Sequence, residues 1–151
     1  MSSEVAQVDD VRVRSGWRGR WAVLLAVALG GGIGASARYG VFQLLPTSPR
    51  HFPLGTFVIN VLGCLLIGVL MTVVTEVRSA HPLTRPFLGV GVLGGFTTFS
   101  TYAEDFRELL RPDAVGLAFG YLAGTLVAAL AAVVSGVWLT RSVIGSPRRA
   151  G

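Results

Sequence analysis

The sequence predicts an all-α membrane protein with four transmembrane helices, and three observations support this fold class. Hydrophobic residues make up 52% of the 151 residues and charged residues only 14%, whereas about a quarter of a soluble domain is charged. Four apolar stretches are long enough to cross a bilayer core, which needs about 20 residues. Small residues recur at four-residue spacing inside these stretches, which is typical of close contacts between membrane helices.

Composition also argues against several function classes. All 13 basic residues are arginines, so the net charge of +5 indicates basic membrane flanks rather than nucleic-acid binding. The single cysteine, Cys64, lies in an apolar run, and we interpret it as a small buried hydrophobe. No group of His, Cys, Asp and Glu has metal-ligand spacing, and no nucleophile lies near a base. We therefore predict that the protein is not an enzyme.

The polar residues 1–20 predict a disordered N-terminal arm, followed by a first transmembrane helix over 21–45. This apolar run lacks a small-residue cleavage site followed by polar sequence, which favours a retained helix over a signal peptide. Ala26, Gly30 and Gly34 recur every four residues and predict a close-packing face. Arg38 continues this stripe. It is either a side chain that snorkels to the interface or a buried arginine that attracts an anion or holds the structure together.

The second helix is predicted over 54–77, after a loop that contains three prolines. Thr56 and Asn60 lie one turn apart in this helix. An asparagine within the membrane is costly unless its amide is hydrogen-bonded. Asn60 therefore either bonds to a neighbouring helix or lines a pore as a donor.

The third segment, 86–110, is predicted to break at Gly94 and Gly95, because adjacent glycines weaken a helix. Backbone groups freed at membrane depth either bind a cation or pack within the bundle. Phe96, Phe99 and Tyr102 recur every three residues after the break. Their electropositive ring edges could face an anion, or the rings could lie in the core or face lipid.

The fourth helix is predicted over 114–140 and carries a polar pair, Tyr121 and Thr125, one turn apart. A stripe of small residues beside this pair predicts a continuous helix contact. The stripe consists of Gly116, Gly120, Gly124, Ala128, Ala132 and Gly136. The polar tail, 142–151, leaves one membrane domain over 21–141 with no internal boundary.

No acidic residue lies in the middle of any segment, which argues against a proton-coupled exporter. The polar residues within the segments are instead hydrogen-bond donors, and such a set suits a small, strongly hydrated anion. Three stretches resemble motifs of the Fluc (CrcB) fluoride channels. Residues 94–102, GGFTTFSTY, resemble the signature GGxTTFSTF, residues 31–39 resemble GGxxGAxxRY, and residues 55–63 resemble GTxxxNxxG. The motifs occur in family order, and the resemblance covers residues 21–140.

The resemblance implies an antiparallel dual-topology dimer with two pores for passive fluoride export, which protects the cytoplasm. It also implies a structural Na⁺ held by the main-chain oxygens of Gly94 and Thr97. By position in the motifs, the pore residues would be Asn60, Phe99, Tyr102, Thr56, Tyr121, Thr125 and Arg38. Tyr102 stands where the family has its second pore phenylalanine, and Ala129 stands where a further hydroxyl is expected.

The arginines favour one orientation in the inner (plasma) membrane, with both termini in the cytoplasm. Nine lie on the side of the termini and three on the other. The chain would then either form a homodimer or pair with an oppositely biased homologue. One alternative is a small dual-topology multidrug transporter, but this predicts a glutamate within the first helix, and residues 22–40 contain none. Another alternative is a partner subunit of a heterodimeric channel that has lost pore residues. The departures from the family pattern at Tyr102 and Ala129 favour this alternative.

Overall fold

The computed structural model describes residues 2–47, 51–76 and 81–144, with the side chains of the first helix described from residue 19 onward. These ranges contain helices and no strand, which confirms the all-α prediction. The elements in chain order are α1 (Ser2–Leu44), α2 (Leu54–Glu76), the π-helix η1 (Arg85–Leu93), α3 (Gly94–Phe96), α4 (Phe99–Leu109) and α5 (Val115–Ile144).

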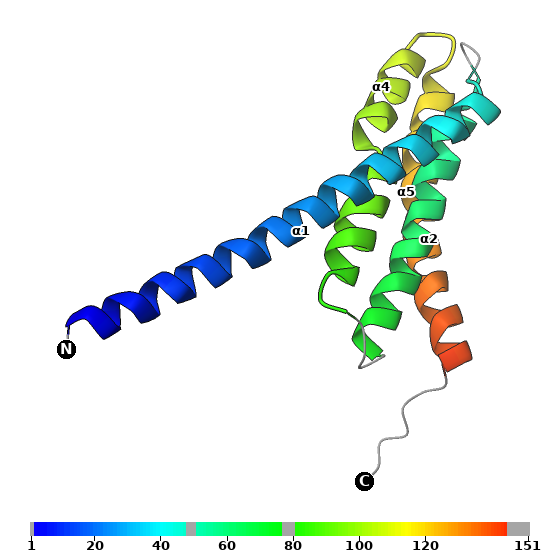
Figure 1. Ribbon diagram of the computed structural model, residues 1–151. Coiled ribbons are helices and arrows are strands. Elements are labelled where there is room, and N and C mark those ends of the chain that lie inside the picture. Colours follow the sequence, from blue (N-terminus) through cyan, green and yellow to red (C-terminus); the bar gives the residue numbers. More distant parts are fainter. Residues whose placement is uncertain (1, 48–50, 77–80, 145–151) are drawn as a thin grey trace.

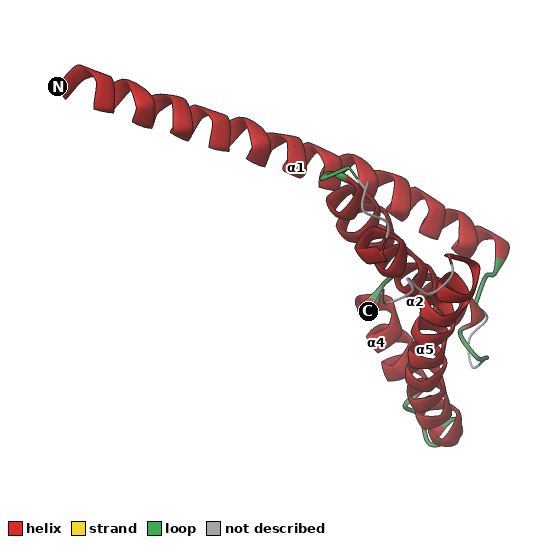
Figure 2. Ribbon diagram, turned by 90° about the horizontal axis from the view of Figure 1, so that it is seen from below, coloured by secondary structure: helices red, strands yellow, loops and turns green. Residues whose placement is uncertain are grey.

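The helices form two packed pairs. α2 packs mainly against α5, and α1 packs mainly against η1 and α3. Figures 1 and 2 show α1 crossing the other helices obliquely, with its N-terminal part extending away from them. The third segment therefore lies between α1 on one side and the α2–α5 pair on the other.

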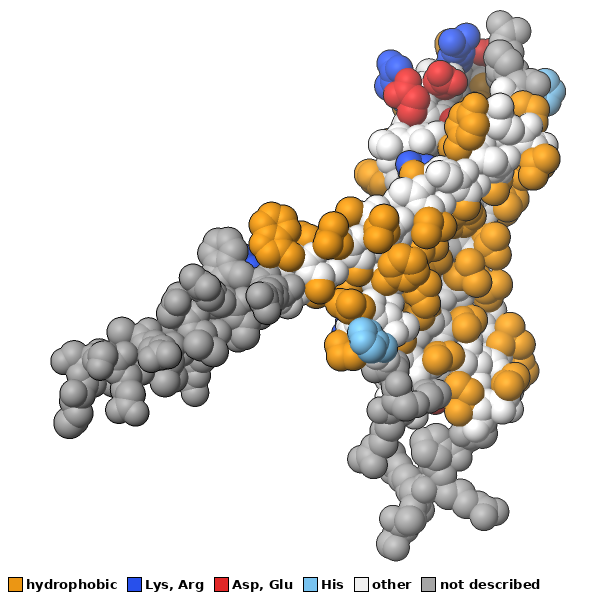
Figure 3. Space-filling view, viewed as in Figure 1, with side chains coloured by type: hydrophobic (Ala, Val, Ile, Leu, Met, Phe, Trp, Pro, Cys, Tyr) orange, Lys and Arg blue, Asp and Glu red, His pale blue; other side chains and the backbone are white. Residues whose placement is uncertain are grey.

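Among the described residues, three helices are long and apolar enough to cross a membrane: Gly19–Leu44 within α1, α2 and α5. They match the first, second and fourth predicted segments. Large hydrophobic side chains cover the outside of the bundle, while charged side chains gather at the end formed by α4 (Figure 3). An apolar exterior of this kind is that of a membrane protein.

The start of the first helix differs from the prediction, because α1 begins at Ser2 rather than near residue 21. The stretch that we expected to be a disordered arm is thus helical from Ser2 onward. The reason lies in its sequence: residues 2–15 contain neither glycine nor proline. Nothing interrupts the extension of a helix that the apolar segment has already nucleated.

The break in the third segment lies at Thr97 and Thr98, so its prediction at Gly94 and Gly95 is wrong. Gly94 has helical angles, with φ −65° and ψ −36°. Thr97 (ψ 157°) and Thr98 (φ −147°, ψ 122°) are extended. Gly95 serves close packing rather than flexibility, because a Cβ atom there would overlap the carbonyl oxygen of Gly31 on α1.

The predicted small face of the first helix is confirmed. Ala26, Gly30 and Gly34 are all buried. A Cβ atom on Gly30 or on Gly34 would overlap a carbonyl oxygen of η1, that of Phe87 or that of Val92 respectively. Backbone contact of this kind lets α1 and the third segment approach each other closely.

Within the described chain, the predicted small-residue stripe of the fourth helix makes contacts in its second half only. Gly136 meets the Leu65 carbonyl on α2, and Ala132 is also buried. At Gly116, Gly120 and Gly124, by contrast, an added Cβ atom would meet nothing within 4 Å in the described chain. In this half the buried face of α5 consists of Ala118, Tyr121 and Thr125 instead. Small size alone does not specify which face of a helix is covered.

Candidate functional site

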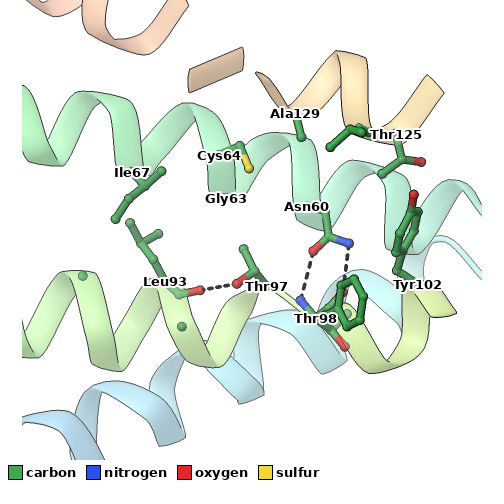
Figure 4. Close-up of a pocket in the computed structure, with 14 residues that line it drawn as sticks. Asn60, Gly63, Cys64, Ile67, Leu93, Thr97, Thr98, Tyr102, Thr125 and Ala129 are labelled. Atoms are coloured by element: carbon green, nitrogen blue, oxygen red, sulfur yellow. Dashed lines mark hydrogen bonds between the residues drawn. The ribbon is translucent and has the colours of Figure 1, made fainter. Parts of the chain in front are cut away.

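A groove of about 440 Å³ opens beside the helix break, between α2, α5 and the third segment (Figure 4). Most of its lining is apolar, and the polar side chains in it come from three separate helical segments. The polar and aromatic lining residues are Asn60, Thr97, Thr98, Phe99, Tyr102 and Thr125. Four of these six were predicted as pore residues from the sequence.

Asn60 binds the break through both ends of its side-chain amide (Figure 4). Its Nδ2 donates to the Thr98 carbonyl at 2.9 Å, and the Thr98 backbone N–H donates to its Oδ1 at 2.9 Å. These bonds match the interpretation that Asn60 bonds to a neighbouring helical segment. Asn60 also lines the groove, and these bonds use only one of the two N–H groups of its amide.

The break also frees two backbone carbonyls. In a continuous helix the Thr98 N–H would bond to the Gly94 carbonyl, but Asn60 has captured it. Likewise, the Thr101 N–H bonds at 3.2 Å to the Thr98 hydroxyl, which acts as an N-cap, and so does not reach the Thr97 carbonyl. The sodium site implied by the family resemblance uses the same two carbonyls, those of Gly94 and Thr97.

Arg38 lies at this break rather than in the groove lining. Its Nη1 donates to the Thr97 carbonyl oxygen at 3.2 Å, across 59 residues of sequence. This contact matches the structural alternative for Arg38 and not the snorkelling one. Together, Arg38 on α1 and Asn60 on α2 hold the two extended residues of the break from both sides.

Two of the three predicted aromatic residues line the groove. Phe99 is 80% exposed, and its ring centroid lies 6.0 Å from that of Tyr102. The Tyr102 hydroxyl donates to the Leu122 carbonyl of α5 at 2.6 Å. Phe96 is buried and precedes the break, so its ring lies in the core, one of the alternatives left open by the sequence, and not beside Phe99 and Tyr102 in the groove. The extended residues between them rotate the two halves relative to each other.

Thr56 and Tyr121 do not line the groove. Both are buried, with exposed fractions of 1% and 0%. The Tyr121 hydroxyl donates to Oδ2 of Asp105 at 3.1 Å, and Thr56 lies within hydrogen-bonding reach of both groups. The ring of Tyr121 packs 5.3 Å from that of Tyr102, so this cluster adjoins the groove behind Tyr102.

The sequence did not identify Asp105 as part of this cluster. The available signal was its spacing of three residues from Tyr102, which places both on one face of α4. Thr125 lies in the groove as predicted. Its side chain is only 4% exposed, and its hydroxyl has no hydrogen-bond partner in the described part of the chain. Ala129 also lines the groove, where a hydroxyl was expected.

Metal ligands of the usual side-chain kind are absent from the described residues, which contain no group of three or more His, Cys, Asp and Glu placed to hold an ion. The oxygens that could hold a cation at the break are the carbonyls of Gly94 and Thr97. What the groove offers to an anion is an amide and the edges of two rings, while the hydroxyl oxygen of Thr125 is buried at its edge.

Comparisons with known proteins show the family of this chain. A family model described as CrcB-like protein, Camphor Resistance (CrcB), matches residues 25–137. "Fluoride-specific ion channel FluC 2" of Nocardia farcinica is 57% identical over 128 residues, which cover 85% of this chain and 91% of the relative. "Fluoride-specific ion channel FluC 1" of Streptomyces coelicolor is 53% identical over 131 residues, covering 87% and 85%.

A more distant relative, "Fluoride-specific ion channel FluC" of Paracoccus denitrificans, is 43% identical over 119 residues, which cover 79% of this chain and 94% of the relative. The match spans three-quarters of the chain and includes the break, the groove and the helices that surround them. The chain therefore belongs to the CrcB-like family, which is a family of membrane ion channels and not of enzymes.

Proposed function

We propose that this protein is a fluoride-selective channel through which fluoride leaves the cytoplasm passively. The observation that carries the proposal is the groove, which holds uncharged donors and ring edges and has no carboxylate among its described lining residues. The names of the relatives, fluoride-specific ion channels, support the choice of ion.

Uncharged donors suit conduction of a small hydrated anion. The second N–H of Asn60 can replace a water molecule of the hydration shell, while the edges of Phe99 and Tyr102 carry partial positive charge. None of these groups bears a full charge, so an ion can bind in place of its water and still leave. Outward flow follows when fluoride enters as its neutral acid and dissociates in the cytoplasm.

A second subunit would complete the site. Phe99 and Leu126 line the groove and are 80% and 60% exposed in the single chain. An irregular, polar stretch of backbone at membrane depth must be covered by protein or line an aqueous cavity. We propose that an antiparallel partner covers it, either a second copy or an oppositely biased homologue. The nine-to-three distribution of arginines favours cytoplasmic termini for this chain in the inner membrane.

The decisive test is ion efflux from liposomes that contain this chain alone. We expect fluoride efflux at a rate typical of a channel and chloride efflux at the background rate. Phe99→Ile keeps the apolar bulk but removes the ring edge, and should slow fluoride efflux by about tenfold or more. The matched control is Phe119→Ile, because Phe119 is 55% exposed and lies outside the groove lining.

Chloride efflux as fast as that of fluoride would defeat the proposed selectivity. Fluoride efflux by this chain alone would show that a homodimer suffices. Efflux that appears only after co-reconstitution with an oppositely biased homologue would show that the chain works in a heterodimer.

We further propose that a structural sodium ion binds at the break, on the carbonyls of Gly94 and Thr97. The two residues fit such an ion, because both oxygens have lost their helical partners. Arg38 uses one lone pair of the Thr97 oxygen and leaves the other. A bound ion would supply positive charge beside the groove, and an antiparallel pair of chains would contribute both carbonyls from each subunit.

Sodium binding to the folded state predicts a shift in thermal stability. At a concentration about 100 times the dissociation constant, a bound ligand adds about 2.7 kcal/mol to the free energy of unfolding. We therefore expect the melting midpoint in sodium chloride to exceed that in N-methylglucamine chloride at equal ionic strength by several degrees. Equal midpoints in the two salts would contradict the sodium site without affecting the proposed anion pathway.

A further inference from the structure

A second groove opens where α1 leaves the bundle. It has a volume of about 470 Å³ and is lined by side chains from residues 22–29 of α1 and residues 83–87 at the start of the third segment. Figures 1 and 2 both show α1 diverging from the other helices toward its N-terminal end. The apolar span of α1 begins at Gly19, so the two segments separate while α1 is still within the membrane.

The lining of this second groove is apolar, with Thr84 as the one polar side chain among its described residues. Leu25 and Leu29 line it and are 61% and 66% exposed. One residue after Leu29, Gly30 packs directly on the backbone of Phe87, so α1 and the third segment are in contact there. An exposed apolar recess at membrane depth can take up a hydrocarbon chain.

Arginines stand at the end of this groove where the two segments enter the membrane. Arg85 is the first residue of η1 and is exposed, and its side chain forms no ion pair with the described residues. Arg141, by contrast, pairs with Glu76 at 2.8 Å. On α1, Arg18 stands four residues before the lining residue Ala22, which is one helical turn. Arg85 is therefore available to an anionic group from outside the chain.

We propose that this groove binds an anionic phospholipid, with an acyl chain against the apolar lining and the phosphate on Arg85. A guanidinium group binds phosphate through two parallel N–H···O bonds, and basic recesses between membrane helices bind anionic headgroups. A zwitterionic lipid such as phosphatidylcholine carries a cation beside its phosphate, which weakens its attraction to Arg85. The groove should therefore prefer lipids with a net negative charge, such as phosphatidylglycerol.

Tryptophan fluorescence tests this proposal, because Trp21 directly precedes the lining residue Ala22 and is 59% exposed. The chain has three tryptophans, so Trp17→Phe and Trp138→Phe leave Trp21 as the reporter. The protein is placed in vesicles of equal parts phosphatidylglycerol and phosphatidylcholine, with brominated chains on one lipid at a time. Bromine quenches a tryptophan that it contacts. We expect a relative binding constant about fivefold or more in favour of phosphatidylglycerol.

Two substitutions separate the headgroup contact from the groove. Arg85→Gln should lower the preference for phosphatidylglycerol by about fivefold, whereas Arg111→Gln, at an exposed arginine in the loop after α4, should leave it unchanged. Ala22→Phe fills the groove and should bring the quenching by the two lipids close to equality. Its matched control is Ala28→Phe, at an exposed position of the same helix outside the described lining, which should keep the preference.

Equal quenching by the two lipids before either substitution would overturn the inference and would show that the groove is filled by a second subunit or takes lipids regardless of charge. A preference that survives Ala22→Phe would also overturn it, because the charge would then act at the surface alone. A preference that inorganic phosphate abolishes at constant ionic strength would show a soluble anion site instead of a lipid site. Fluoride enters none of these measurements, so their outcome is independent of the proposed channel function.

Discussion

Gly95→Ala is expected to lower the melting midpoint of the protein by about 6–12 °C. The added methyl group would overlap the carbonyl oxygen of Gly31 and would lie 3.0 Å from its Cα atom. Both are backbone atoms of α1, so no side chain can rotate away to make room. Overpacking costs about 1–3 kcal/mol, and a contact between two backbones belongs at the upper end, where each kcal/mol moves the midpoint by about 2–4 °C.

Gly32→Ala is the matched control for this change. Gly32 lies on the same helix as Gly31, but a Cβ atom there meets nothing within 4 Å in the described chain. Alanine is the better helix former by about 1 kcal/mol, so the midpoint should stay constant or rise slightly. A Gly95→Ala protein as stable as the natural one would show that α1 does not pack on the third segment in the way described here.

Asn60→Leu is expected to abolish fluoride efflux, with a loss of about 100-fold or more. The substitution removes both hydrogen bonds to Thr98, whose side chain is 95% buried. Each buried backbone group left without a partner costs about 1–3 kcal/mol, so the break would rearrange. The groove would at the same time lose its amide donor. Efflux from liposomes measures the loss, and circular dichroism would show that the helices remain.

Asn60→Asp separates the two roles of this residue. A carboxylate still accepts from the Thr98 N–H but no longer donates to its carbonyl, and it places negative charge beside an anion pathway. We expect partly retained thermal stability with efflux as low as in Asn60→Leu. Thr75→Val, an exposed position on the same helix, should affect neither quantity strongly. Efflux close to the natural rate in Asn60→Asp would refute the donor role.

The sequence predicts the helices of this protein well, because their limits depend on local chemistry. A proline-rich loop ends before α2, which begins at Leu54 as predicted and continues to Glu76, the last residue described before the next loop. The position of the break depends instead on tertiary contacts. Two adjacent glycines indicate weakness, but the helix opens where Asn60 captures the N–H of Thr98, 38 residues away in sequence. No local pattern reports such a bond.

The difference between local chemistry and tertiary contacts also explains which groove residues could be predicted. Asn60, Phe99, Tyr102 and Thr125 were identified through motif positions, and the structure brings all four together. Thr56 and Tyr121 were assigned to the same lining, but their burial beside Asp105 depends on how α4 is rotated after the break. The glycines of the first half of α5 face away from the rest of the chain for a related reason. The spacing of these glycines predicts that they share one face of the helix, but it does not predict which segment packs against that face.

The hydrogen bonds from Arg38 and Asn60 to the break also affect how the protein enters the membrane. A chain is made from its N-terminus, so Arg38 and Asn60 are synthesised 59 and 38 residues before Thr97 and Thr98, the residues they hold. During that interval a cation and an amide sit in apolar helices without their final partners, which favours shallow or hydrated positions. The arrival of the third segment gives both side chains their acceptors and allows the first two helices to settle. We therefore expect the first two helices to reach their final depth only after the third segment has inserted.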